Sequence, residues 1–366
     1  MNGSEAADLS DFSDPELVYT VDLSTALDQA KKKRKNSILQ VCRPKDALDD
    51  FAGSVSRGLS QRPRSLDCRF LYDAKGSMLY EEITAQPEYY LARTEAAILE
   101  MYARSIAAIT GPVTLLELGS GASVKTRHLL RVYAANHAPR YIPIDICESA
   151  LREASRTLTN KLPAIQVIGI HAAYEDALPL LPRTSPAMVL FLGSTVGNMA
   201  SEEERGFFSW LAHHMPADDF FLLGIDLVKE VDLIEAAYND AAGVTAAFTT
   251  NYFMRMNREL GSTVDTTAVR HLAAYNESRQ QIEIHAAFSR TQKIFIVPRG
   301  EVHLVDEGEK ILMEISRKFL IEERIDYFSR LNFKVREVFI DPKQWFALIL
   351  LQKGGVTAQS YKCTEI

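Results

Sequence analysis

Apolar residues follow two patterns along this chain, and each pattern predicts a different kind of structure. Between about residues 113 and 228, short and nearly continuous apolar runs alternate with longer amphipathic stretches. Continuous apolar runs are typical of strands buried on both faces of a parallel sheet, and amphipathic stretches are typical of the helices that cover it. The pattern therefore predicts an α/β fold built on a doubly wound parallel sheet.

The strands expected in this sheet are VTLLEL, YIPIDI, IQVIGIHA, AMVLFL and DFFLLGIDLV. Helices are expected between them at KTRHLLRVYAANH, at SALREASRTLTNKL and, more briefly, at 174–182. A further helix near 319–331 precedes KVREVFID and WFALILLQK. These two runs predict a terminal antiparallel hairpin around Asp341-Pro342-Lys343-Gln344.

The other segments lack this alternation. Residues 46–105 have the pattern of helices, with QPEYY as an extended aromatic segment before the last of them. After residue 230, one helix over EAAYNDAAGVTAAFTTNYFMRMNREL leads into the strand-like pieces QQIEIHAAF, TQKIFIVP and EVHLVD. We therefore expect three parts: a sheet domain from 93–228 and 319–366, a second, α+β domain from 46–92 and 229–318, and a polar, flexible extension over 1–45.

Composition and charge narrow the classes of function. The chain has 366 residues and a formal net charge of −7, which argues against a broad nucleic-acid surface. The basic run at 31–35 is interpreted as a solvated face or arm, because acidic residues surround it. Apolar runs are shorter than the ~18 residues of a membrane span, and the start MNGSEAADLSDFSD lacks a signal-peptide pattern. We expect a cytoplasmic monomer with neither a membrane nor a nucleic-acid partner.

Cysteine and histidine spacing gives no sign of a metal centre. The four cysteines lie far apart and form no CxxC pair, and the eight histidines show no ligand spacing. No metal is therefore expected.

A glycine turn follows the first strand of the alternating region, in Glu117-Leu118-Gly119-Ser120-Gly121. Glycines let the backbone turn tightly and approach a ligand closely. Val124 occupies the position of the third glycine of a dinucleotide fingerprint, which disfavours a pyrophosphate ligand. Glu117, before the turn, suits a nucleoside that carries a cationic amino acid part, and Asp145, at the end of the next strand, can accept both ribose hydroxyls. Together they indicate S-adenosylmethionine, although an ordinary turn and a helix N-cap remain open alternatives.

A second polar turn, Gly193-Ser194-Thr195-Val196-Gly197-Asn198, follows the strand at 187–192. Small and polar residues cannot continue a packed core there. In an open parallel sheet, ligands bind just beyond the carboxyl ends of the strands. This turn is therefore a candidate ligand site, unless Asn198 only bonds to the backbone of its own turn.

Longer segments carry a resemblance to a known family. From about residue 68 to 353, the chain resembles the histidine-specific Nα-methyltransferases of ergothioneine biosynthesis, which convert histidine to its trimethylbetaine, hercynine. The matching segments are FLYDAKGSMLYEEIT, PEYYLARTEAAIL, LLELGSGASVKTRHLL, YIPIDI, FLGSTVGN, LLGIDLVKE, AAYNDAAGVTAAF, NRELG and EISRKF. The resemblance implies a Rossmann-like class I methyltransferase sheet with a separate substrate-binding domain.

The resemblance also implies a role for each matching position. The expected methyl-donor contacts are Glu117, Gly119, Gly121, Lys125 and Asp145. The expected amino acid contacts are Tyr72, Tyr89, Gly193, Asn198, Tyr238, Ile284, Glu314 and Ser316. Among these, Asn198, Tyr238 and Tyr89 are expected at the reacting amine, with Asn198 and Tyr238 clamping the amino and carboxylate groups. The family's acidic contact to adenine is replaced near Ala173, where Glu175 or Asp176 could substitute.

Glu314-Ile315-Ser316 carries the expected selectivity for imidazole. Residues i and i+2 of an extended segment face the same side. A carboxylate accepts from one imidazole N–H and a hydroxyl serves the other nitrogen. The alternatives are an exposed Glu314 with Ser316 as a helix N-cap, an enzyme for tryptophan-type amines, a dinucleotide-dependent oxidoreductase, and a non-catalytic donor-binding module. No residue stands out in the sequence as the base.

Overall fold

The central sheet is ordered by the helices that connect its strands. The computed structural model describes residues 15–33, 36–41 and 47–355. Within these residues the strand order is β1-β2-β5-β4-β3-β6-β7-β14-β13, with β14 antiparallel to both of its neighbours. The strands are β1 (Glu16–Thr20), β2 (Ser37–Val41), β3 (Thr114–Leu118), β4 (Arg140–Asp145), β5 (Gln166–His171), β6 (Ala187–Phe191), β7 (Phe220–Asp226), β13 (Phe333–Ile340) and β14 (Phe346–Lys353).

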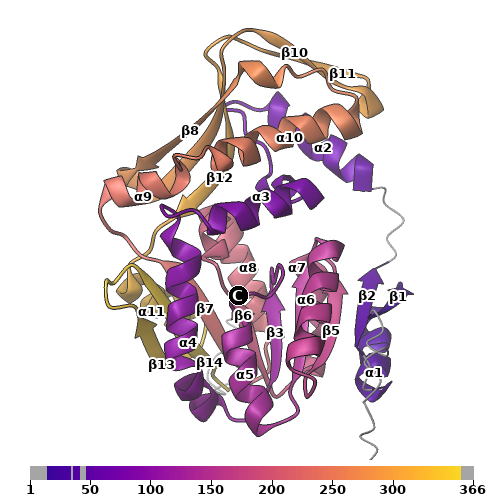
Figure 1. The fold of residues 1–366 in the computed structure, drawn as a ribbon, viewed down its shortest axis with the longest axis vertical. Helices are drawn as coiled ribbons and strands as arrows, with labels where there is room; N and C mark the ends of the chain where they lie inside the picture. The colour runs from indigo at the N-terminus through magenta and orange to yellow at the C-terminus, as the bar shows by residue number, and fades with distance from the viewer. Residues whose placement is uncertain (1–14, 34–35, 42–46, 356–366) are drawn as a thin grey trace, which may run out of the picture.

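Helices cover both faces of this sheet, as the alternating pattern predicts. Helices α4 and α5 lie on one face of the sheet (Figure 1), and α1, α8 and α11 contribute apolar side chains to the core on the other face. Every residue of β6 and β7 is buried, which explains their uninterrupted apolar sequences. The helices around the sheet are α1 (Leu23–Lys33), α4 (Tyr90–Thr110), α5 (Arg127–Asn136), α6 (Glu148–Lys161), α7 (Tyr174–Ala177), α8 (Ser201–His214) and α11 (Ile321–Arg330). The predicted α/β class and the terminal hairpin are confirmed.

A second layer of helices and antiparallel strands lies over the upper end of the sheet (Figure 1). Its three-stranded sheet has the order β12-β9-β8, and β10 and β11 form a separate hairpin. Its elements are α2 (Ala47–Ser60), α3 (Ala74–Thr84), α9 (Val231–Tyr238), α10 (Val244–Leu260), β8 (Val269–Asn276), β9 (Gln281–Phe288), β10 (Gln292–Ile296), β11 (Glu301–Val305) and β12 (Lys310–Arg317). These are the segments expected in an α+β substrate domain, although where one domain ends and the other begins stays a prediction.

The N-terminal segment differs from the expected flexible extension. Its described part forms β1, α1 and β2, and β2 pairs in parallel with β5 at the edge of the sheet. Leu27 of α1 and Ile38 and Leu39 of β2 are fully buried. These apolar stretches are too short, and too mixed with charge, to stand out in the sequence. Residues 1–14 and 42–46 lie outside the described residues.

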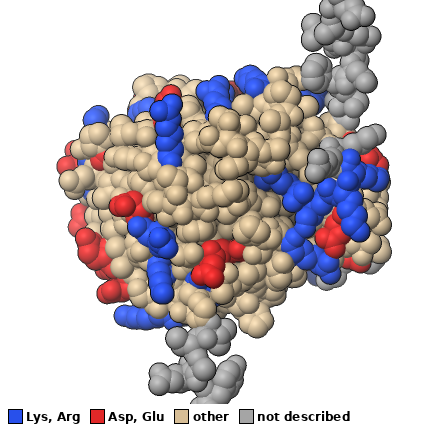
Figure 2. Space-filling view, turned by 90° about the horizontal axis from the view of Figure 1, so that it is seen from below, with Lys and Arg blue, Asp and Glu red and all other residues tan. Residues whose placement is uncertain are grey.

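The basic run also has partners in the structure. Lys31, in the last turn of α1, lies 3.7 Å from Asp28, and Lys33 lies 3.4 Å from Glu16. Figure 2 shows acidic side chains among the Lys and Arg side chains of the lower face. The described part of the run therefore belongs to a mixed charged surface.

Three local predictions are corrected by the structure. The single helix expected over 235–260 is two helices, because Asp240 accepts the N–H groups of Val244 and Thr245 at 2.7 and 2.8 Å and Gly243 has φ 72°. The QPEYY segment is a turn, and Tyr90 already begins α4. Strand β8 has no counterpart in the prediction, because its alternation of more and less buried residues is too weak to stand out in the sequence. Among the described helices, none is long and apolar enough to cross a bilayer.

Candidate active site

The carboxyl ends of β3, β4, β6 and β7 meet below the second layer, and the predicted site residues gather there. β3 pairs in parallel with both β4 and β6, and β6 pairs in parallel with β7. Their loops therefore open at the same edge of the sheet, where an α/β fold binds its ligands. Two groups of residues form there, one around the glycine turn and one between β6 and β12.

The glycine turn has the geometry of a close approach to a ligand. Gly119 and Gly121 have φ of 68° and 50°, a backbone conformation that favours glycine. The Asp145 carboxylate accepts the Gly121 N–H at 2.8 Å and the Cys147 N–H at 2.9 Å. Burial raises the pKa of Asp145, and those N–H groups oppose the rise. Asp145 is therefore held at the mouth of the turn, at the end of the strand beside it.

Glu117 is placed beneath the turn instead of beside a ligand. Its two oxygens accept from Thr126 Oγ1 at 2.7 Å and from the Tyr141 hydroxyl. Burial raises the pKa of Glu117 to about 7. In this structure it supports the start of α5, and its predicted contact with the donor stays a prediction.

Glu95 joins the two halves of the site. It is fully buried on α4, and its carboxylate pairs with Lys125 Nζ and accepts the Gly193 N–H at 2.8 and 2.9 Å. Lys125 belongs to the predicted donor set and Gly193 to the predicted acceptor set. The two sets therefore share one buried carboxylate.

Four residues predicted to hold the amino acid form two direct pairs. Asn198 Nδ2 donates to Glu314, and Tyr238 and Ser316 are joined by a 2.7 Å hydrogen bond between their hydroxyls. Asn198 and Glu314 are half-buried, so both can be reached by a ligand, and burial raises the pKa of Glu314 to about 7. Ile284 of β9 pairs with Glu314 of the neighbouring strand β12 and is buried. The extended Glu314-Ile315-Ser316 is confirmed as part of β12, so Ser316 is not a helix N-cap.

The polar turn that carries Asn198 packs directly on β12. Its short helix η3 (Thr195–Asn198) contains Gly197, where an added Cβ would lie 2.9 Å from the Arg317 carbonyl oxygen. A buried carboxylate, Glu204 of α8, pairs with both Arg317 and Arg324 and ties β12 to the sheet domain. This close packing sets the distance between Asn198 and Glu314.

Aromatic rings line the approach from the N-terminal helices. Tyr238 contacts Tyr89 with ring centroids 6.0 Å apart, and Tyr89 lies 6.5 Å from Tyr80. Tyr72 then packs edge-on against Tyr80 and Phe248 at 5.5 and 5.3 Å. Tyr72 and Tyr89 thus belong to one aromatic group with Tyr238, while their predicted contact with substrate stays a prediction.

A buried charged cluster lies behind Tyr238. Asp226, at the end of β7, pairs with Lys318 at 2.8 Å and with Lys229, and it accepts from the Tyr90 hydroxyl at 2.8 and 3.0 Å. We call these four residues, Tyr90, Asp226, Lys229 and Lys318, the charged cluster. Lys318 and Asp226 are buried completely.

Sequence reasoning missed Glu95 and the charged cluster, although signals for them exist. Glu95 stands on the apolar face of α4, in register with Leu91, Ile98 and Leu99. Asp226 ends an apolar strand as Asp145 does, and Lys318 continues the two-residue period of Glu314 and Ser316.

The family's acidic contact to adenine is replaced in this chain, and one further candidate for that contact lies beside the glycine turn. Tyr174 begins α7, and an added Cβ at Gly119 would lie 2.6 Å from its hydroxyl oxygen. Tyr174 therefore lies beside the glycine turn and is a further candidate for the contact with adenine. The side chain of Glu175 lies outside the described part of the structure.

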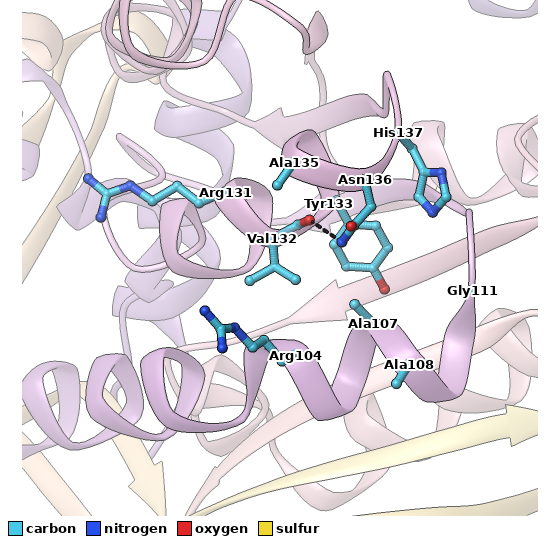
Figure 3. A pocket seen from close by; sticks show the side chains of 10 residues that line it. All are labelled: Arg104, Ala107, Ala108, Gly111, Arg131, Val132, Tyr133, Ala135, Asn136 and His137. Carbon is cyan, nitrogen blue, oxygen red and sulfur yellow. Dashed lines mark hydrogen bonds between the residues drawn. The ribbon is translucent and has the colours of Figure 1, made fainter.

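A cavity of about 670 Å³ lies far from these residues. Figure 3 shows it between the ends of α4 and α5, lined by Arg104, Arg131, Tyr133, His137 and their neighbours. Gly111 of its wall comes shortly before β3, so the cavity lies at the amino ends of the strands. No group of three or more His, Cys, Asp or Glu side chains within the described ranges is arranged to hold a metal ion.

Several known proteins are similar to this chain over most of its length. The family described as "Histidine-specific methyltransferase, SAM-dependent" matches residues 51–353. A histidine N-alpha-methyltransferase of Mycolicibacterium smegmatis is 37% identical over 305 residues, which cover 83% of this chain and 95% of that protein. One of Mycobacterium tuberculosis is 35% identical over 268 residues, covering 72% and 83%. Ergothioneine biosynthesis protein 1 of Schizosaccharomyces pombe is 27% identical over 303 residues, covering 79% and 39%.

Replacing Glu95 tests the buried connection between the two halves. We expect Glu95→Gln to lower the free energy of unfolding by about 1–3 kcal/mol, because it leaves Lys125 without its anionic partner in a partly buried position. Urea denaturation measures the change. Glu100→Gln on the same helix is the control, because the Glu100 side chain is 72% exposed. Equal midpoints for both variants would contradict a buried ion pair at Glu95.

Replacing Gly197 tests the packing of η3 on β12. We expect Gly197→Ala to destabilise the protein by about 1–3 kcal/mol, because the new methyl group meets backbone atoms that cannot turn aside. In Gly206→Ala, nothing lies within 4 Å of the added Cβ, so a neutral or stabilising effect is expected. Thermal unfolding of the two variants is the measurement, and a neutral Gly197→Ala would show that the turn is not seated on β12.

Proposed function

The chain belongs to the family of S-adenosylmethionine-dependent, histidine-specific methyltransferases, and from this premise we propose that it methylates the α-amino group of L-histidine three times. The product is hercynine, as in ergothioneine biosynthesis. The observation that carries the proposal is the pairing of Asn198 with Glu314 and of Tyr238 with Ser316 at the carboxyl edge of the sheet. The membership also excludes a dinucleotide-dependent oxidoreductase.

The residues around the glycine turn fit the methyl donor. When bound, S-adenosylmethionine supplies an electrophilic methyl group on a sulfonium. Gly121 leaves open space beside the turn, since nothing lies within 4 Å of an added Cβ there, and Asp145 holds a carboxylate where ribose hydroxyls can donate to it. Lys125 offers an ammonium for the carboxylate of the donor's methionine part, and Glu95 fixes its position. In this proposal Lys125 exchanges part of its pairing with Glu95 for the ligand.

In each of the pairs Asn198–Glu314 and Tyr238–Ser316, one residue would contact the imidazole ring and the other the amino or carboxylate group of the amino acid. Glu314 accepts one imidazole N–H and Ser316 bonds to the other ring nitrogen, as their shared face on β12 allows. Asn198 and Tyr238 then hold the amino and carboxylate groups, with Gly193 beside the reacting nitrogen. Tyr72 and Tyr89 cover the substrate from the side of the aromatic group. The chain holds the nucleophile in line with the donor, which is the main requirement of a direct displacement.

Selectivity would come from polar groups that another side chain cannot satisfy. An indole has one N–H and no ring acceptor, so it can donate to Glu314 but offers no acceptor to Ser316, which keeps only its bonds to Tyr238 and Lys318. A side chain without an N–H would lose the bond to Glu314 as well, and each lost hydrogen bond to a buried group costs about 1–3 kcal/mol. Ile284, opposite Glu314, limits the space beside the ring.

We further propose that the enzyme is cytoplasmic and acts as a monomer. Every residue assigned to the site comes from a single chain, and both substrates are small and diffusible. The sheet and the second layer both contribute residues to the proposed site, so both are needed for activity.

Mass spectrometry of the reaction products tests the activity itself. Incubation with histidine and S-adenosylmethionine should give additions of one, two and three methyl groups on the α-nitrogen, with the trimethylated product accumulating. Tryptophan, offered at the same concentration, should remain unmodified. Methylated tryptophan without methylated histidine would replace this proposal with that of a tryptophan-type enzyme.

Replacing Glu314 tests its role in recognising imidazole. We expect Glu314→Ala to raise KM for histidine about 10- to 100-fold while KM for the donor changes little, because it removes one charge-assisted hydrogen bond. Glu283→Ala on β9 is the control, since the partners of Glu283 lie outside the proposed site: it accepts from Asn276 and Gln281 at 3.0 and 2.9 Å and lies 4.0 Å from Arg279. An equal rise in both Michaelis constants would assign Glu314 a structural role.

A further inference from the structure

Lys318 has an unusual position for a lysine, because all of its donors are used inside the protein. Its side chain is 0% exposed. The ammonium lies 2.8 Å from Asp226, 2.9 Å from the Tyr238 hydroxyl and 2.9 Å from Ser316 Oγ. A lysine ammonium has three N–H donors and no acceptor, so these three partners use it completely. Lys318 is therefore fixed and cannot relay a proton while it is charged.

Lys318 connects the charged cluster to the acceptor pair. Tyr238 and Ser316 bond to each other in front of the ammonium, and Asp226 bonds to it from behind. The Lys318 ammonium also lies 4.7 Å from the centre of the Tyr238 ring. A ligand that bonds to either hydroxyl is thus separated from a full positive charge by a single side-chain oxygen.

The charged cluster contains two lysines and one carboxylate, since Lys229 also pairs with Asp226. The titratable groups that act on Lys318 or on its partners come from several elements. They are Glu314 on β12, Asp226 after β7, Lys229 in the following loop, Tyr90 on α4, Tyr238 on α9, Tyr275 on β8 and Asp341 before β14. Because Asp226, Asp341 and Glu314 oppose the two lysines, the feature that faces Tyr238 is the positive end of the Lys318–Asp226 ion pair and not a surplus of charge.

The pKa values of Lys318 and Lys229 show how this environment affects positively charged groups. Asp226 and Tyr238 raise the pKa of Lys318 against the opposing effect of burial, so it stays charged. The pKa of Lys229 is lowered to about 8, chiefly by burial and partly by repulsion from Lys318. Repulsion from Lys318 therefore acts in the same direction as burial on a neighbouring cation and favours its neutral form.

We propose that Lys318 holds a fixed positive charge behind Tyr238 and Ser316 and so keeps the α-amino group of the bound amino acid in its neutral, nucleophilic form. This inference rests on the proposed function. Lys318 would act through Tyr238 and Ser316 and would be a positioning residue, without contact to the reacting atoms.

The physical argument is a difference in charge between two forms of the substrate. The α-amino group of a free amino acid has a pKa well above 7 and is mostly protonated at neutral pH, when it has no lone pair for methyl transfer. Two successive hydrogen bonds of about 2.9 Å place a group on Tyr238 within roughly 6 Å of the Lys318 ammonium. Repulsion over that distance lowers the pKa of a bound ammonium by about one to two units. The same charge attracts the carboxylate, so the site favours carboxylate with neutral amine.

The pH dependence of kcat at saturating histidine tests this role. The acidic limb of that profile reports the ionisation of the enzyme–substrate complex, whereas Glu314 in the free enzyme affects KM. We expect Lys318→Met to move the acidic limb up by about one pH unit or more, and Lys318→Arg to leave it in place. Lys229→Met should move it up by a smaller amount, which keeps the test decisive if Lys318→Met does not fold. Lys310→Met, at the exposed start of β12, is the matched control.

A purely structural Lys318 predicts a different result. The rate would then fall by the same factor at every pH, with the limb unmoved, and that outcome would overturn this inference alone while the wild-type enzyme still methylates histidine. If the wild-type enzyme forms no methylated histidine at any pH, the proposed function fails and this inference fails with it. Calorimetric counting of the protons released when histidine binds gives an independent measure, and Lys318→Met should release fewer.

Discussion

The ion pair between Asp226 and Lys318 is the constraint on which the rest of the site depends. It joins the end of β7, in the parallel sheet, to the residue that follows β12, in the antiparallel one. Both side chains are fully buried, and a buried charge is tolerated only when its partners are in place. The backbones agree with this pairing, because the Phe319 N–H donates to the Asp226 carbonyl at 2.9 Å. With these two strand ends fixed, Glu314 bonds to Asn198 in the turn after β6 and Ser316 bonds to Tyr238 of α9.

Each half of the site is held by a carboxylate that takes no obvious part in recognition. Glu95 fixes Lys125 and Gly193 on one side, and Glu204 fixes Arg317 on the other. Such supporting groups restrict the motion of the residues that contact ligands, which is how a site becomes preorganised. Asn198 and Glu314, which are proposed to contact the substrate, are half-buried, so the supporting carboxylates lie inside and these two side chains can be reached from the edge of the site.

The sequence was informative where one physical pattern dominated. Fully buried strands such as β6 and β7 give uninterrupted apolar runs, and Gly119 and Asp145 follow such runs at the positions where ligands bind. The sequence was uninformative where burial is partial or long-range. Strand β8 alternates buried and exposed residues too weakly to stand out, and β2 is buried only because β5 lies beside it. Glu95 and Lys318 resemble surface charges until their partners, far away in the chain, are known.

The route of the chain between β7 and α11 has a structural consequence. The segment leaves the parallel sheet at Asp226 and returns at Phe319, and these two points are hydrogen-bonded neighbours. Because this segment leaves and rejoins the sheet at adjacent positions, it can change in length or in sequence without moving the sheet. Tyr238, Ile284, Glu314 and Ser316, four of the residues proposed to hold the amino acid, lie in this segment, whereas Asn198 and Gly193 lie on the sheet domain. Part of the proposed acceptor site can therefore diverge among relatives while the sheet and the glycine turn stay unchanged.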